Sequence, residues 1–288
     1  MSLLGMQRVI SRILTDKQFR TAFTDDLQGV ISAYELTPKE IRSLKALDLK
    51  AASSYARLLA EGRVGLALNA FPLSRILLTP DIHRYIDEYC QENPPTPATL
   101  SPMFFESMIF YAFILKVIER GDPVSPYLRD VIEYEKNLFY IANSVEASAS
   151  ASRFAADNQK WGGGLSLEAV GGLKPVKGEH AQVVRFRYKV TELMPLIERG
   201  EVPTVGEDPI DLLFFKRPLH VGVKTCKINC STRELLESCD GSRTTKTIIV
   251  DLWRTAGATT NAARDSIAAG VIRILDTLQA SAVIRFDD

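Results

Sequence analysis

HVGVKTCKINCSTRELLESCDG, residues 220–241, is the stretch that decides the fold class, because it passes directly from a strand pattern into a helix pattern. Its first part, HVGVKTCKIN, is an extended run typical of a strand. In the second part, Ser231 is a suitable helix cap and Asp240-Gly241 is a typical turn, so a short helix is predicted between them. A strand that leads straight into a helix indicates a mixed fold.

The flanking segments extend this pattern. Upstream, AQVVRFRY (181–188) and DLLFFKRP (211–218) are two more extended runs. Downstream, TTKTIIVDLWRTAG (244–257) and NAARDSIAAGVIRILDTLQASAVI (261–284) show helical patterns. Strands followed by three helices are the order of a winged-helix-like module, which we predict for residues 179–288.

The chain before residue 144 has the pattern of an all-α domain. In TPKEIRSLKALDLKAASSYARLLAEG, Thr37 can cap a helix, Pro38 occupies its first position and Glu40 completes a capping box. Apolar residues then recur at helical spacing until Gly62 breaks the pattern. We therefore predict an all-α domain over residues 1–143.

Residues 144–178 differ in composition from both regions. They combine SVEASASAS with the glycine-dense WGGGLSLEAVGGLKPVKGEH. Small polar residues and glycines favour flexible connectors, so we interpret 144–178 as a Gly/Ser-rich linker, with a helix in its first part as the open alternative. The predicted fold class is α+β: an N-terminal all-α domain, then a C-terminal winged-helix-like domain of three strands and three helices.

Composition argues against several classes of partner. Lysine plus arginine equals aspartate plus glutamate, at 35 each, which gives no electrostatic reason to expect nucleic acid or an anionic membrane. No apolar run is long enough to span a bilayer. The start, MSLLGMQRVISRIL, is interrupted by Arg8 and Arg12 and lacks the long apolar core of a signal peptide. We expect a cytoplasmic protein without membrane contact.

The sequence carries no motif with a stated catalytic mechanism. His83, His180 and His220 lie in separate segments without ligand-spaced neighbours, although they could still converge in space. Cys226 and Cys230 are half of a metal site at most, and small apolar side chains in a core are the favoured interpretation. We therefore predict a non-enzymatic protein with neither metal nor other cofactor in this chain.

Two segments resemble known families. SSYARLLAEGRVGLALNAFPLSRILLTPDIHRYIDEYCQENPP (53–95), with SPYLRDVIEYEKN (125–137) and VVRFRYKVTELMPL (183–196), resembles the DUF2063-type family, which is named for DNA binding. KINCSTRELLESCDGSRTTKTIIVDL (227–252) resembles the RiPP recognition element, a peptide-binding winged helix of ribosomal peptide biosynthesis. There a strand leads into a cap, a leucine-bearing helix and Cys-Asp-Gly, here Cys239-Asp240-Gly241.

Together the two segments resemble the partner subunits of multinuclear non-haem iron-dependent oxidases that modify cysteines in ribosomally made peptides, most of all those of 3-thiaglutamate biosynthesis. The resemblance implies a non-catalytic subunit of a heterodimer, with the iron in the oxidase subunit. It also implies that the chain binds a leader or scaffold peptide by strand addition and presents its C-terminal cysteine to the oxidase.

By that resemblance, the peptide binds between an edge strand over 221–228 and a helix over 261–278. The implied strand contacts are Val221, Val223, Lys224, Thr225, Cys226, Lys227 and Ile228. The implied helix contacts are Arg264, Ile267, Val271 and Leu275. Ordinary core packing for the apolar members, and solvent exposure for Lys227 and Arg264, remain open alternatives.

A winged-helix DNA-binding regulator is the competing interpretation. A helix that reads a DNA groove needs unopposed basic and amide side chains. In the last predicted helix Asp265 follows Arg264 directly, and Asp276 follows Arg273 at helical spacing. This charge pattern disfavours the regulator, and a stand-alone hydrolase or oxidase is the third possibility.

Overall fold

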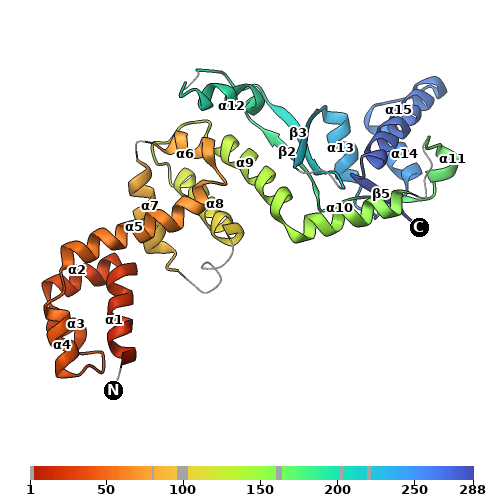
Figure 1. Ribbon diagram of the computed structural model, residues 1–288. Coiled ribbons are helices and arrows are strands. Elements are labelled where there is room, and N and C mark those ends of the chain that lie inside the picture. The colour runs from red at the N-terminus through yellow and green to blue at the C-terminus, as the bar shows by residue number, and fades with distance from the viewer. Residues whose placement is uncertain (1–2, 80, 96–102, 160–163, 202–203, 219–221) are drawn as a thin grey trace. The chain divides into compact units, whose positions relative to one another are not determined.

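The computed structural model describes residues 3–79, 81–95, 103–159, 164–201, 204–218 and 222–288 (Figure 1). The chain divides into two compact units, Met1–Ile132 and Glu133–Asp288. The division falls inside helix α9 (Leu128–Asn143), so the residues after Ile132 that were assigned to the helical domain belong to the second unit.

The first unit is helical in its described residues. Its helices are α1 (Leu3–Thr15), α2 (Lys17–Asp25), α3 (Leu27–Ile31), α4 (Pro38–Lys45), α5 (Leu49–Leu68), α6 (Pro72–Leu78), α7 (Ile82–Glu92), α8 (Met103–Glu119) and the start of α9. The predicted capping box is present at α4, where Thr37 accepts from the Glu40 N–H and Glu40 accepts from the Thr37 N–H. Local sequence chemistry therefore fixes where this helix begins.

The second unit combines helices with strands. After α9 come α10 (Val145–Asn158), α11 (Leu167–Val170), β1 (Lys174–Lys177), β2 (Ala181–Phe186), α12 (Val190–Glu198), β3 (Ile210–Lys216), β4 (Val223–Ile228), α13 (Cys230–Ser238), α14 (Thr245–Thr255), α15 (Asn261–Ala280) and β5 (Ile284–Asp287). Strands β2, β3 and β4 form an antiparallel sheet in that order, and β1 pairs with β5 separately. The protein is therefore of mixed α+β class, as predicted.

The central strand β3 is buried on both faces, which explains its continuous run of apolar residues. Leu213 and Phe215 join one core cluster with residues of α13, α14 and α15. Leu212 and Phe214 join another with Tyr134 of α9 and Val190 of α12. The sheet thus lies between two groups of helices.

The described residues of 144–178 include α10, α11 and β1, so the flexible-linker interpretation is wrong for them, and the open alternative of a helix in the first part is confirmed. Ser144 caps α10 by accepting from the Ala147 N–H at 3.1 Å. The small residues that suggested flexibility instead allow close packing, since Ser150 and Ala151 are buried. Trp161, Gly162 and Gly163 of the glycine-dense run lie outside the described residues.

Candidate functional site

Strand β4 has an open edge. Among the described residues β3 is the strand that pairs with it, and β4 ends the sheet. Lys224, Cys226 and Lys227 are exposed, while Val223, Thr225 and Ile228 are half-buried. Val221 lies outside the described residues. An edge strand of this kind is a template for pairing with another extended chain.

The hydrogen-bond pattern of the sheet shows which backbone groups face the edge. The Lys216 N–H donates to the His180 carbonyl at 3.2 Å, so the even-numbered residues of β3 bond towards β2. The odd-numbered residues of β3 then bond towards β4, where their partners are Lys224, Cys226 and Ile228. The remaining β4 residues, Val223, Thr225 and Lys227, direct their N–H and C=O groups to the open edge.

Side chains on β4 alternate between the two faces of the sheet. Cys226 is opposite Leu213 and shares the face that packs against α13, α14 and α15. Thr225 is opposite Phe214 and shares the face of α9 and α12, as Val223 does. The strand residues that offer backbone groups at the edge therefore turn their side chains away from α15.

The predicted residues of α15 do not form one surface. Ile267 and Val271 line a hollow of about 380 Å³, and Leu275 is fully buried in the core. Arg264 donates from Nε to the Ala258 carbonyl at 3.2 Å and lies over the Trp253 ring. The structure therefore places Arg264 in contact with α14 and with the turn that precedes α15.

The hollow is walled by helices. Its lining consists of Ser231, Glu234, Leu235, Leu252, Thr255, Ala256, Ile267, Gly270, Val271 and Ile274. Within this lining α13, α14 and α15 are represented and β4 is not, so the predicted strand-and-helix cleft separates into an edge and a neighbouring hollow. Ile228 and Ile267 nevertheless pack against the same core cluster.

Gly270 is a site residue that the sequence prediction missed. It lies within the helix α15, where glycine costs about 1 kcal/mol relative to alanine. Its φ is not positive, and a Cβ added to it would meet no atom within 4 Å, so neither backbone conformation nor packing requires a glycine. Its effect is to keep the hollow open. The feature of the sequence that could have identified this residue is a glycine inside a strongly periodic helical pattern.

No family model matches this chain, and no curated protein matches it. The interpretation of the site therefore depends on its geometry and on the patterns in the sequence.

The histidines and cysteines occupy separate environments. His83 is exposed beside Glu61, His180 is fully buried, and His220 lies outside the described residues. Cys226 and Cys230 are exposed thiols, so the core interpretation favoured for them is wrong. Cys230 donates to Glu234 at 3.1 Å. Across the part of the chain that the structure describes, no three His, Cys, Asp or Glu residues are grouped so as to hold a metal ion.

Burial makes the Cys239 thiol inert. It is buried in the core cluster behind β3 and donates to the Leu235 carbonyl at 3.2 Å. Burial raises the pKa of Cys239 to about 12, so it is a neutral thiol at pH 7.

Among the described helices, none is long and apolar enough to cross a membrane.

Proposed function

We propose that this chain is the non-catalytic partner subunit of an iron-dependent peptide-modifying oxidase and that it binds a leader or scaffold peptide at the edge of β4. The observation that carries the proposal is the open edge, where Val223, Thr225 and Lys227 direct their backbone groups outward. An extended peptide that adds there gains main-chain hydrogen bonds without any change in the sheet.

The hollow beside α15 supplies selectivity. Main-chain pairing is the same for every peptide sequence, so discrimination needs pockets for particular side chains. Leu235, Leu252 and Ile274 make the hollow largely aliphatic, and Gly270 keeps it open. This favours a peptide with a bulky aliphatic residue close to its added strand.

The order of elements supports a winged-helix-like recognition module. Strands β2, β3 and β4 precede α13, α14 and α15, with α12 inserted between β2 and β3, and one core cluster joins the sheet to the three later helices. The segment that resembles the RiPP recognition element, 227–252, covers the end of β4, all of α13 and most of α14. Arg233 ties α13 to the sheet through Asp211, with Nε 3.4 Å from Oδ2.

In this proposal the chemistry belongs to an iron-bearing oxidase subunit with which the chain forms a heterodimer. Holding the leader raises the effective concentration of the peptide's C-terminal cysteine at the iron site. This chain then needs no cofactor of its own. The chemistry would be of the 3-thiaglutamate type.

Anisotropy titration of the purified chain with a labelled leader peptide tests the proposal. We expect low-micromolar or tighter binding that survives high salt, because backbone pairing and aliphatic contacts carry it. Binding to duplex DNA that falls steeply with salt, without peptide binding, would instead support the regulator. Stoichiometric iron or zinc in the purified chain would contradict the non-catalytic role.

A further inference from the structure

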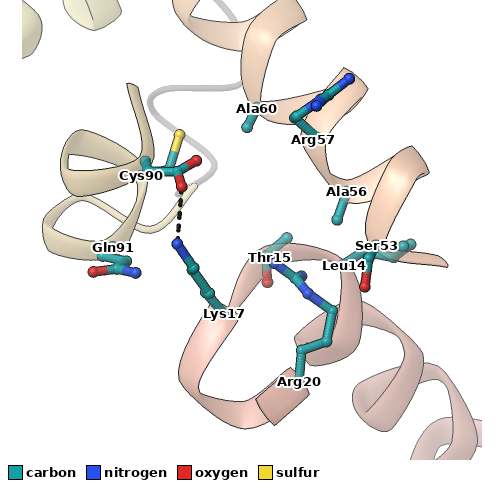
Figure 2. Close-up of a pocket in the computed structure, with 11 residues that line it drawn as sticks. Leu14, Thr15, Lys17, Arg20, Ser53, Ala56, Arg57, Ala60, Cys90 and Gln91 are labelled. Atoms are coloured by element: carbon teal, nitrogen blue, oxygen red, sulfur yellow. Dashed lines mark hydrogen bonds and ion pairs between the residues drawn. The ribbon is translucent and has the colours of Figure 1, made fainter. Parts of the chain in front are cut away.

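A groove in the first unit has no part in the proposed function. It lies between the turn that joins α1 to α2, helix α5 and the end of α7 (Figure 2). Its outer lobe has a volume of about 200 Å³. An adjoining inner lobe of about 220 Å³ shares Leu14, Ala56, Ala60 and Cys90 with it. We name this two-lobed space the α5 groove.

The outer lobe is cationic. Lys17, Arg20 and Arg57 line it, with Asp87 as the carboxylate of its lining. Lys17 Nζ lies 2.9 Å from Asp87 Oδ2, and both side chains are about half exposed. An ion pair this exposed contributes about 0–1 kcal/mol to stability, so Lys17 can also bind the anionic group of a ligand.

Arg20 adds a second positive charge to the lining of the same lobe. It donates from Nη1 to the Ile13 carbonyl at 2.5 Å, which fixes the side chain beside the end of α1. No described carboxylate lies within ion-pair distance of it. A guanidinium that is positioned but not neutralised is suited to binding a carboxylate.

The inner lobe is largely apolar. Leu14, Leu59 and Pro95 line it, and the small side chains of Ala56 and Ala60 leave its space unfilled. Thr15 and Arg63 complete the lining, and the Arg63 guanidinium is paired with Glu106 at 2.8 Å. Burial raises the pKa of the Cys90 thiol to about 11, so at pH 7 it is neutral. This lobe therefore accommodates hydrocarbon, whereas the outer lobe accommodates an anion.

We propose that the α5 groove binds an aliphatic carboxylate. The carboxylate lies at Lys17 and Arg20, and the hydrocarbon chain enters the inner lobe past Ala60. Ligand sites typically combine apolar walls with a few placed polar groups, as this groove does. Two sources share this chemistry: a free alkanoate, and the C-terminal aliphatic residue of a peptide.

Calorimetric titration of the full chain with hexanoate, hexanol and hexylamine tests the headgroup. The three probes share a hydrocarbon chain and differ in charge. Hexanoate should bind one site with a dissociation constant of about 1 mM or lower, and at least about tenfold more tightly than hexylamine. Equal binding of the amine, or no binding of hexanoate, overturns the proposal.

Variants then locate the site. Lys17→Gln should weaken hexanoate binding about tenfold, and Ala60→Leu should abolish it by filling the inner lobe. Asp87→Asn should tighten binding, because it removes the carboxylate that competes for Lys17. Arg8→Gln removes the same charge from an exposed position of α1 outside the lining and should change nothing.

Thermal melts confirm that each variant is folded. Among the folded variants, unchanged affinity in Lys17→Gln and Ala60→Leu, or weaker binding in Asp87→Asn, contradicts the site.

N-acetyl-leucine and its amide distinguish the two sources. Binding of N-acetyl-leucine that exceeds hexanoate and is lost in the amide identifies a peptide C-terminus as the ligand. Weaker binding than hexanoate identifies a free alkanoate. Because these probes and variants do not involve β4, failure here leaves strand addition untouched, and failure of strand addition leaves the α5 groove untouched.

Discussion

His180 donates a hydrogen bond from Nε2 to the carbonyl oxygen of Ala282 at 2.7 Å, and its Nδ1 lies 2.9 Å from the hydroxyl oxygen of Ser150. The fully buried ring thus joins α10 to the turn between α15 and β5. A carbonyl oxygen can only accept, so Nε2 carries a proton. In the neutral ring Nδ1 then accepts from the Ser150 hydroxyl.

We predict that the second unit loses stability as the pH falls below about 6.5. Burial lowers the pKa of His180 below its ordinary value of 6.5. Between the two values the unfolded chain binds a proton that the folded chain does not, so acidification through this window favours unfolding. Urea midpoints measured from about pH 8 to about pH 5.5 should be level at first and then decline.

His180→Gln and His83→Gln form the matched pair for that prediction. Glutamine cannot titrate, so His180→Gln should be less stable at neutral pH but show a shallower decline on acidification. His83 is exposed, and its replacement should leave the profile unchanged. If the decline persists in His180→Gln, other groups cause the pH dependence.

A buried ion pair stabilises the first unit. Glu106 is 3% exposed, and its Oε1 lies 2.8 Å from Arg63 Nε and 2.5 Å from the Tyr89 hydroxyl. Arg63 Nε does not meet hydrogen-bond geometry, but Nη1 donates to the Asn93 carbonyl at 2.7 Å. We predict that Glu106→Gln costs about 3–5 kcal/mol of unfolding free energy, because it leaves a buried guanidinium without its counter-charge.

Urea denaturation of the Arg63→Met and Glu106→Leu variants, singly and together, measures this coupling. The double variant should lose less unfolding free energy than the two single variants lose in sum, because it removes both charges of the pair. Strictly additive costs would show that the two side chains do not stabilise each other.

Much of the fold could be predicted because its signals are local. The cap at Thr37, the extended runs of β2, β3 and β4, and the periodicity of α15 depend on neighbours in sequence. Residues 144–178 could not be assigned in this way. Alanines favour a helix and Ser144 can cap one, but small and polar side chains are equally typical of a connector. The burial of Ser150 and Ala151 orders the segment, and composition does not reveal that burial.

The site could be predicted only in outline. The edge position of β4 was implied by the resemblance to the RiPP recognition element, and two of the implied helix contacts, Ile267 and Val271, line the hollow. The sequence could not predict which β4 residues direct their backbone groups to the open edge. That alternation follows from the pairing of Lys216 with His180 on the other side of β3. Gly270 was overlooked because a helical pattern is recognised from its apolar side chains, and glycine has no side chain.

We predict that Gly270→Leu stabilises the protein while it weakens peptide binding. Leucine restores about 0.8–1.0 kcal/mol of helix propensity and meets no atom within 4 Å at its Cβ, so the melting temperature should rise by about 2–4 °C. The same side chain fills the hollow, so affinity should fall at least about tenfold. Ala269→Leu, at an exposed neighbouring position, should leave affinity unchanged. Full affinity in Gly270→Leu would exclude the hollow from peptide binding.

Proline at neighbouring positions of β4 separates edge binding from folding. The Thr225 N–H is directed to the open edge, so Thr225→Pro removes a donor for an added strand and leaves the pairing with β3 intact. The Cys226 N–H is directed to β3, so Cys226→Pro breaks the ladder and should cost about 1–3 kcal/mol of stability. Circular dichroism and peptide anisotropy should therefore find Thr225→Pro folded but unable to bind, and Cys226→Pro destabilised. A folded Thr225→Pro variant that binds peptide as the wild type does would rule out strand addition at this edge. Destabilisation of Thr225→Pro rather than Cys226→Pro would show that the strand phase derived from the pairing of Lys216 with His180 is reversed.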